Sequence, residues 1–261
     1  MSSSGEKAIE RPLIPKFFEN LLTVMGKTSG RDKAFKLIQY TIRFHKVVLF
    51  KNKKFAKHPL AREIFGRLMA LASAFSLARN AMRLGRPFTS YSNVIRNIIK
   101  YRQNRNDKNP FNKWRSLSYT ITKSISDFGL MVNFLFDHIL FLCKIDILKS
   151  RKLRDDADLI SNYFWLIDCL ASFYADGYDI FLLRKEVAAL KEENEDEALS
   201  LKIKDKEEQI MDKSLTYIKN LVELPTIFFY IDESKYISHA KAYFLISFSS
   251  IISLYSLWPS H

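Results

Sequence analysis

Three acidic side chains in the second half of the chain could do metal chemistry. Asp168, Asp176 and Asp179 stand at positions i, i+8 and i+11 of a predicted helix over 161–183, so their carboxylates share one side of that helix. Carboxylates can hold a divalent cation, but only when further oxygen ligands converge on the same point. Acidic residues along a helix more commonly form a solvated face. We therefore expect a solvated face here and no bound metal.

Other residues that suggest catalysis lack the required context. Residues 26–30, GKTSG, miss the upstream glycine and the preceding apolar strand of a phosphate-binding loop. Asp137 and His138 are adjacent and cannot share a helix face, so we interpret Asp137 as a buried acid that forms hydrogen bonds. The five histidines show no ligand spacing, and Cys143 and Cys169 lie in apolar runs typical of buried free thiols. We expect no enzyme activity and no cofactor.

The charge of the chain is divided unevenly. Residues 1–125 contain 26 Lys and Arg against 6 Asp and Glu, a net charge of +20, whereas residues 126–261 carry −7. A half so basic calls for an anionic partner, either nucleic acid or an anionic membrane surface. No motif that reads nucleic acid accompanies it, so we expect the membrane.

The segment 60–84 is the clearest amphipathic helix in the sequence. At 100° per residue its large apolar side chains cluster within about 80°, and we expect this face to insert into a membrane: Leu60, Ile64, Leu68, Leu71, Phe75 and Met82. The arginines on and beside the helix are expected to contact anionic lipid headgroups: Arg62, Arg67, Arg79, Arg83 and Arg86. A core-facing helix of a soluble bundle shows the same stripe, and that alternative stays open.

The segment 242–260 contains no charged residue. A helix of this length rises about 28 Å, close to the about 30 Å hydrocarbon core of a bilayer, which predicts a transmembrane anchor. Ser249, Ser253 and Ser256 share one face, and small residues let helices pack closely in membranes, so we expect this face to contact another helix. A buried helix of a soluble bundle is the alternative.

Long periodic apolar stretches with few Gly and Pro predict an all-α protein, a membrane-associated helical bundle with an N-terminal amphipathic helix and a C-terminal transmembrane helix. We expect a flexible lead over 1–15, a helical membrane-associated region over 16–183, a charged helical or disordered insertion over 184–213, and a C-terminal helical region with the anchor over 214–261. The apolar segment 125–148 has Asp137 near its middle, a charge that costs about 2.5–3.5 kcal/mol in a bilayer, so we expect it not to span alone. A helix over 215–224 is expected to stop at Pro225.

Four stretches carry a resemblance to a known family: TSGRDKAFKLIQYTIRF (28–44), FSLARNAMRLGR (75–86), NFLFDHILFLCKIDIL (133–148) and SSIISLYSLWP (249–259). In this order and spacing the chain resembles the peroxin-11 family of peroxisomal membrane proteins. Two features depart from the family's pattern. Serine stands where the family's last segment is richer in glycine, and the insertion over 184–213 is strongly charged.

The resemblance implies a peroxisomal membrane protein that elongates the organelle membrane during proliferation and fission, by insertion of the helix over 60–84. It also implies a homo-oligomer, with the organelle-division machinery and an import receptor for membrane proteins as further partners. The alternative within the same resemblance is a pore or transport component for small metabolites. Such a pore needs polar positions on several helices, of which Asp137, Asp168 and Asp176 are the candidates.

Overall fold

The computed structural model describes residues 16–104, 110–192, 197–232 and 237–259. Nine α-helices and no strand lie within these ranges: α1 Lys16–Gly26, α2 Thr28–Leu49, α3 Lys53–Lys57, α4 Pro59–Met82, α5 Arg86–Asn104, α6 Pro110–Lys144, α7 Arg151–Lys191, α8 Glu197–Ile231 and α9 His239–Tyr255. The predicted all-α class is confirmed. The flexible lead predicted for 1–15 lies outside the described residues.

Local sequence sets several helix ends. Pro59 occupies the first turn of α4, where its missing N–H costs no hydrogen bond. The hydroxyl groups of Ser150 and Ser238 cap α7 and α9 by accepting from the backbone N–H groups of Leu153 and Lys241. Gly85, with a φ of 91°, makes the left-handed turn that separates α4 from α5.

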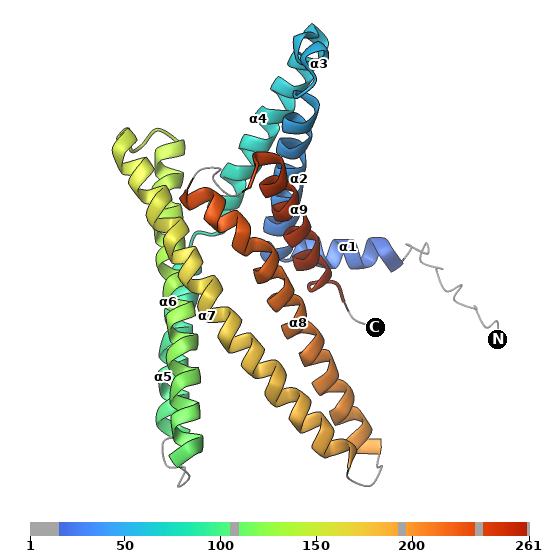
Figure 1. The fold of residues 1–261 in the computed structure, drawn as a ribbon, viewed down its shortest axis with the longest axis vertical. Coiled ribbons are helices and arrows are strands. Elements are labelled where there is room, and N and C mark those ends of the chain that lie inside the picture. The colour runs from blue at the N-terminus through green and yellow to red at the C-terminus, as the bar shows by residue number, and fades with distance from the viewer. Residues whose placement is uncertain (1–15, 105–109, 193–196, 233–236, 260–261) are drawn as a thin grey trace, which may run out of the picture.

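The helices pack as two antiparallel groups that meet along α8 (Figure 1). In one group α6 lies between α5 and α7, and α7 pairs with α8 over much of its length. In the other group α2 packs against α4 and α9, with the short α3 at the tip of the α2–α4 hairpin. Contacts between α8 and α9 join the two groups. The rings of Phe17 in α1 and Trp258 lie 5.4 Å apart between centroids, so residues near the two ends of the described chain lie side by side.

The expected helix end at Pro225 is wrong. Helix α8 continues through this proline to Ile231. The proline lacks the N–H that would bond to the carbonyl four residues earlier, yet Glu223, Thr226 and Ile227 around it are all buried in contacts with other helices. Tertiary packing therefore holds the helix together where the local sequence would end it.

The charged segment 184–213 forms the end of α7 and the first half of α8, and its described residues are helical. Two ion pairs join the helices there, Lys191 with Glu207 at 2.8 Å and Lys206 with Glu186 at 2.7 Å. Exposed pairs of this kind contribute about 0–1 kcal/mol each. This end of the hairpin is a hydrated, weakly stabilised extension of the bundle.

Polar and apolar side chains are less strictly divided between interior and surface than in a soluble protein. Many polar residues are buried, including Asp32, Gln39, Asp176 and Glu223. Large apolar side chains meanwhile lie exposed on every helix from α4 to α9. Soluble monomers rarely expose extended apolar surface, whereas lipid accommodates it at no cost.

One helical segment among the described residues, Ser116–Lys144 of α6, is long and apolar enough to cross a membrane. Length and composition alone allow this segment to span, and the expectation that it does not span alone stays a prediction. Its two acids are partnered inside the protein: Asp127 accepts from Asn97 of α5 at 2.9 Å, and Asp137 pairs with Arg83 at 3.1 Å. Helix α9 has 17 residues, a rise of about 26 Å, so it is shorter than the anchor predicted over 242–260.

Candidate functional site

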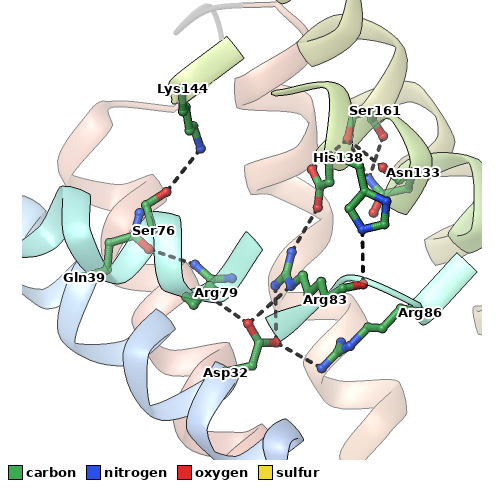
Figure 2. A network of polar contacts seen from close by, with 11 residues as sticks. Asp32, Gln39, Ser76, Arg79, Arg83, Arg86, Asn133, His138, Lys144 and Ser161 are labelled. Carbon is green, nitrogen blue, oxygen red and sulfur yellow. Dashed lines mark hydrogen bonds and ion pairs between the residues drawn. The ribbon is translucent and has the colours of Figure 1, made fainter. Parts of the chain in front are cut away.

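The centre of the molecule is organised by Asp32, a carboxylate of α2 with no exposed surface. Its Oδ1 atom accepts from Nε of Arg79 at 3.1 Å and from Nε of Arg83 at 3.2 Å, and its Oδ2 atom lies 3.5 Å from Nη2 of Arg86. Figure 2 shows the three guanidinium groups converging on this carboxylate from the end of α4 and the start of α5. One acid thus fixes both ends of the turn at Gly85.

Burial alone would raise the pKa of Asp32. The charges of Arg83 and Arg79 outweigh this effect and hold the pKa well below its usual range. The carboxylate is therefore ionised at every physiological pH. Its single negative charge faces three positive ones, so the cluster carries excess positive charge.

The cluster extends through Arg83 into α6. The Nη1 atom of Arg83 donates to Oδ2 of Asp137 at 3.1 Å, and Ser161 of α7 donates to the other carboxylate oxygen at 3.3 Å. Nε2 of His138 lies 3.2 Å from the backbone oxygen of Arg83 (Figure 2). Asp137 is thus a hydrogen-bonded acid, as predicted, but it is half-buried rather than buried. Together with His138 it holds α4 against α6.

A second cluster surrounds Glu223 of α8. Its Oε1 atom lies 2.6 Å from Nζ of Lys36 in α2 and accepts from the hydroxyl of Ser249 in α9 at 2.8 Å. Burial alone would raise the pKa of Glu223, but the charges of Lys36, Lys219 and Lys33 hold it well below its usual range. A single buried carboxylate therefore joins three helices that are far apart in the sequence.

The arginines predicted to contact lipid divide into two sets. Arg79 is buried, and Arg83 and Arg86 are occupied by Asp32. A guanidinium held by a protein carboxylate has fewer N–H groups left for a headgroup phosphate, and contact with lipid stays a prediction for these three arginines. Arg62 and Arg67 remain at the surface, with Arg67 paired to Glu63 at 2.7 Å.

The buried face of α4 is not the face that was predicted to insert into a membrane. Its buried line runs through Ala61, Phe65, Ala72 and Arg79. The predicted apolar face lies beside that line, and Leu60, Ile64 and Leu71 are 57%, 45% and 44% exposed. Leu68, Phe75 and Met82 are half-buried, and the Phe75 ring packs on Phe35 of α2 at 4.7 Å between centroids. The outer half of the predicted face is free for an apolar partner.

Helix α9 buries small polar side chains and exposes large apolar ones, the reverse of a surface helix in a soluble protein. Ser249, Ser250 and Ser253 are buried against neighbouring helices, whereas Ser256 lies at the exposed C-cap. Its exposed face carries the large side chains Phe244, Phe248, Ile251 and Tyr255. Small polar residues inward and large apolar residues outward is the pattern of a helix packed in lipid.

The three aspartates of α7 do not form the solvated face that was expected. Asp176 and Asp179 lie 3.4 Å and 2.6 Å from Nζ of Lys213 in α8. Asp168 accepts instead from the hydroxyl groups of Ser126 and Ser172, at 2.7 Å and 3.2 Å. Packing of α8 against α7 engages Asp176 and Asp179, and packing of α6 against α7 engages Asp168.

The two cysteines are free and buried, as predicted. The thiol of Cys169 donates to the backbone oxygen of Asn220 at 3.5 Å, and burial raises its pKa to about 12. It is therefore neither a nucleophile nor a metal ligand at physiological pH.

Helix α5 presents an outer apolar stripe that sequence reasoning missed. Phe88, Tyr91, Ile95, Ile98 and Ile99 are all exposed and recur at helical spacing. Residues 86–104 are polar on average, so their composition does not indicate an apolar stripe. The signal that would have found it is the 3.6-residue period of its few apolar residues.

Comparison with known proteins identifies the family of the chain. Residues 18–258 match the family model described as Peroxisomal biogenesis factor 11 (PEX11). The chain belongs to the PEX11 family. Membership confirms the resemblance noted in four separate stretches of the sequence and places this PEX11 family chain at the peroxisomal membrane.

A relative in Dictyostelium discoideum, named Peroxisomal membrane protein 11 homolog, is 23% identical over 188 residues. The match covers 70% of this PEX11 family chain and 63% of the relative, so the chain spans less than two thirds of that protein's length. No solved structure matches the chain.

Proposed function

We propose that this PEX11 family protein elongates the peroxisomal membrane during peroxisome proliferation and fission by inserting the outer face of α4 into one leaflet. The observation that carries the proposal is the exposure of Leu60, Ile64 and Leu71 along one side of α4. A wedge of apolar side chains in one leaflet expands that leaflet relative to the other, and the bilayer bends. A core-facing helix would instead bury these side chains.

The magnitudes favour attachment to a membrane. Full burial of a large apolar side chain contributes about 1.5–3 kcal/mol, so three half-exposed ones together supply a few kcal/mol. Surface arginines near an anionic headgroup layer add about 1 kcal/mol each, a role left to Arg62 and Arg67. The exposed stripe of α5 enlarges the apolar surface beside α4.

The test uses the full-length protein added to vesicles of phosphatidylcholine that contain an anionic phospholipid. Ile64→Glu/Leu71→Glu places carboxylates on the outer face of α4 at positions that are already exposed, so the fold is retained. Ser73→Glu is the control, because Ser73 is exposed on the opposite side of the same helix. Wild type and control should draw the vesicles into tubules, and the double variant should not. Equal tubulation by all three proteins would refute insertion of this face.

Transport of small metabolites is a second candidate, favoured by one observation, a polar cavity at the centre of the bundle. Solute flux across liposomes that contain the reconstituted protein tests it. Homo-oligomerisation and contact with the division machinery or an import receptor remain proposals from the family resemblance. Chemical cross-linking of the protein in isolated peroxisomes tests them.

A further inference from the structure

A cavity of about 420 Å³ lies between α2, α4, α6, α7 and α8. Eight Lys and Arg side chains line it against four Asp and Glu side chains. Its volume falls within the range of about 300–1,000 Å³ that is usual for small-ligand sites. The excess of cations suits an anionic ligand.

Pairing within the protein leaves part of this positive charge unbalanced. Arg79, Arg83 and Arg86 are held by Asp32, behind the wall of the cavity. Of the three lysines whose charges act on Glu223, only Lys36 contacts it. In the part of the chain that the structure describes, Lys33 and Lys219 form no ion pair with a carboxylate.

Lys33 and Lys219 therefore face the cavity as like charges. Burial lowers the pKa of Lys33 well below its usual range, and the neighbouring charges of Lys36 and Lys219 lower it further. Lysines kept together at this cost are typical of a site whose counter-charge is a ligand. A phosphate group carries up to two negative charges and three acceptor oxygens, which matches two spare ammonium groups.

We propose that this cavity binds a small phosphate-bearing anion, with Lys33 and Lys219 as its counter-charges. The volume admits the phosphate together with a small organic group such as glycerol. The same chemistry could come from a soluble phosphate ester or from the headgroup of an anionic phospholipid. This inference goes beyond membrane bending and does not depend on it, because neither lysine lies on the outer face of α4.

The test measures binding and thermal unfolding of the full-length protein in neutral detergent. One arm adds glycerol 3-phosphate, with glycerol and with chloride at matched ionic strength as references. The other arm adds short-chain phosphatidic acid, with short-chain phosphatidylcholine as reference. A ligand bound only by the folded state raises the midpoint temperature in proportion to the logarithm of its concentration.

The decisive variant is Lys33→Gln/Lys219→Gln, and the control with the same charge change is Lys51→Gln/Lys204→Gln, at exposed lysines outside the cavity. Wild type and control should bind at least one of the two probes, and the cavity variant should bind it more than about tenfold more weakly. Binding of the soluble ester identifies a soluble ligand, and binding of the lipid alone identifies a headgroup. Absence of a shift with both probes, or equal affinity of both variants, overturns the proposal.

Two further readouts keep the test independent of folding and of membrane bending. Without ligand, the cavity variant should still unfold in one cooperative transition, because Lys36 remains paired with Glu223. It should also still deform vesicles if the outer face of α4 does that work. A failed anion test with normal vesicle deformation would refute the cavity site alone.

Discussion

The side chains of Lys36 and Glu223, 187 positions apart, form a buried ion pair of 2.6 Å that joins α2 to α8. Removal of one partner of a buried pair usually costs about 3–5 kcal/mol, because the other charge is left buried. Here the two removals are not equivalent. Glu223→Gln leaves three lysines without a counter-charge, whereas Lys36→Met leaves Glu223 in the field of Lys33 and Lys219.

We therefore expect Glu223→Gln to lower the free energy of unfolding more than Lys36→Met, by at least about 1 kcal/mol. Denaturant unfolding in detergent, followed by circular dichroism, measures both. Equal losses would show that Lys33 and Lys219 do not act on Glu223.

Asp32→Asn should be among the most damaging single substitutions. It leaves three arginines around a neutral amide, at a cost of about 3–5 kcal/mol. The matched control is Glu63→Gln, which breaks an ion pair of similar length at the surface and should cost about 0–1 kcal/mol. Thermal unfolding of the two variants side by side makes the comparison, and similar midpoint temperatures would contradict a structural role for the cluster.

The pH dependence of stability follows from Asp32 and Glu223. Both have pKa values lowered in the folded state, so the unfolded chain takes up protons first as the pH falls below its own carboxyl values of about 3.9 and 4.3. The contribution of these groups should be complete above about pH 5 and should be lost progressively below about pH 4. Chemical unfolding at a series of pH values measures this loss, and Asp32→Asn should flatten the curve. An equally steep loss in the variant would contradict the assignment.

Substitution of glycine by alanine should have opposite effects on stability at Gly30 and at Gly66. A Cβ on Gly30 would overlap the backbone carbonyl of Val24 in α1, so Gly30→Ala should displace α1 and destabilise the fold. A Cβ on Gly66 would meet no atom, and Gly66→Ala should stabilise α4 by about 0.5–1 kcal/mol. The sign of the change in the unfolding midpoint for each variant checks both predictions.

The thiol of Cys169 should resist alkylation while the protein is folded. Its pKa near 12 and its burial leave almost no exposed thiolate at pH 7.5. Mass spectrometry after iodoacetamide treatment should find Cys169 unmodified in native micelles and modified after denaturation. Rapid modification in the native protein would show that α7 and α8 separate readily.

Periodicity and local signals predicted most helices from the sequence, but not which face of each helix is buried. For 60–84 the period correctly located an apolar stripe, yet the buried line runs beside it through Ala61 and Phe65. Arg79 is paired with Asp32, which lies 47 positions earlier in the chain, and no local sequence pattern reveals such a partner. Pro225 shows the same limit, because packing on both sides of it overrides a strong local signal.

The length of α7 has a mechanical consequence. Its 41 residues rise about 60 Å, twice the about 30 Å of a hydrocarbon core. A straight helix of that length would stand well clear of a bilayer at one end if it were set across one, and the charged tip that it shares with α8 is the end suited to water. Set across a bilayer in this way, the hairpin would act as a spacer that holds its charged tip away from the headgroups.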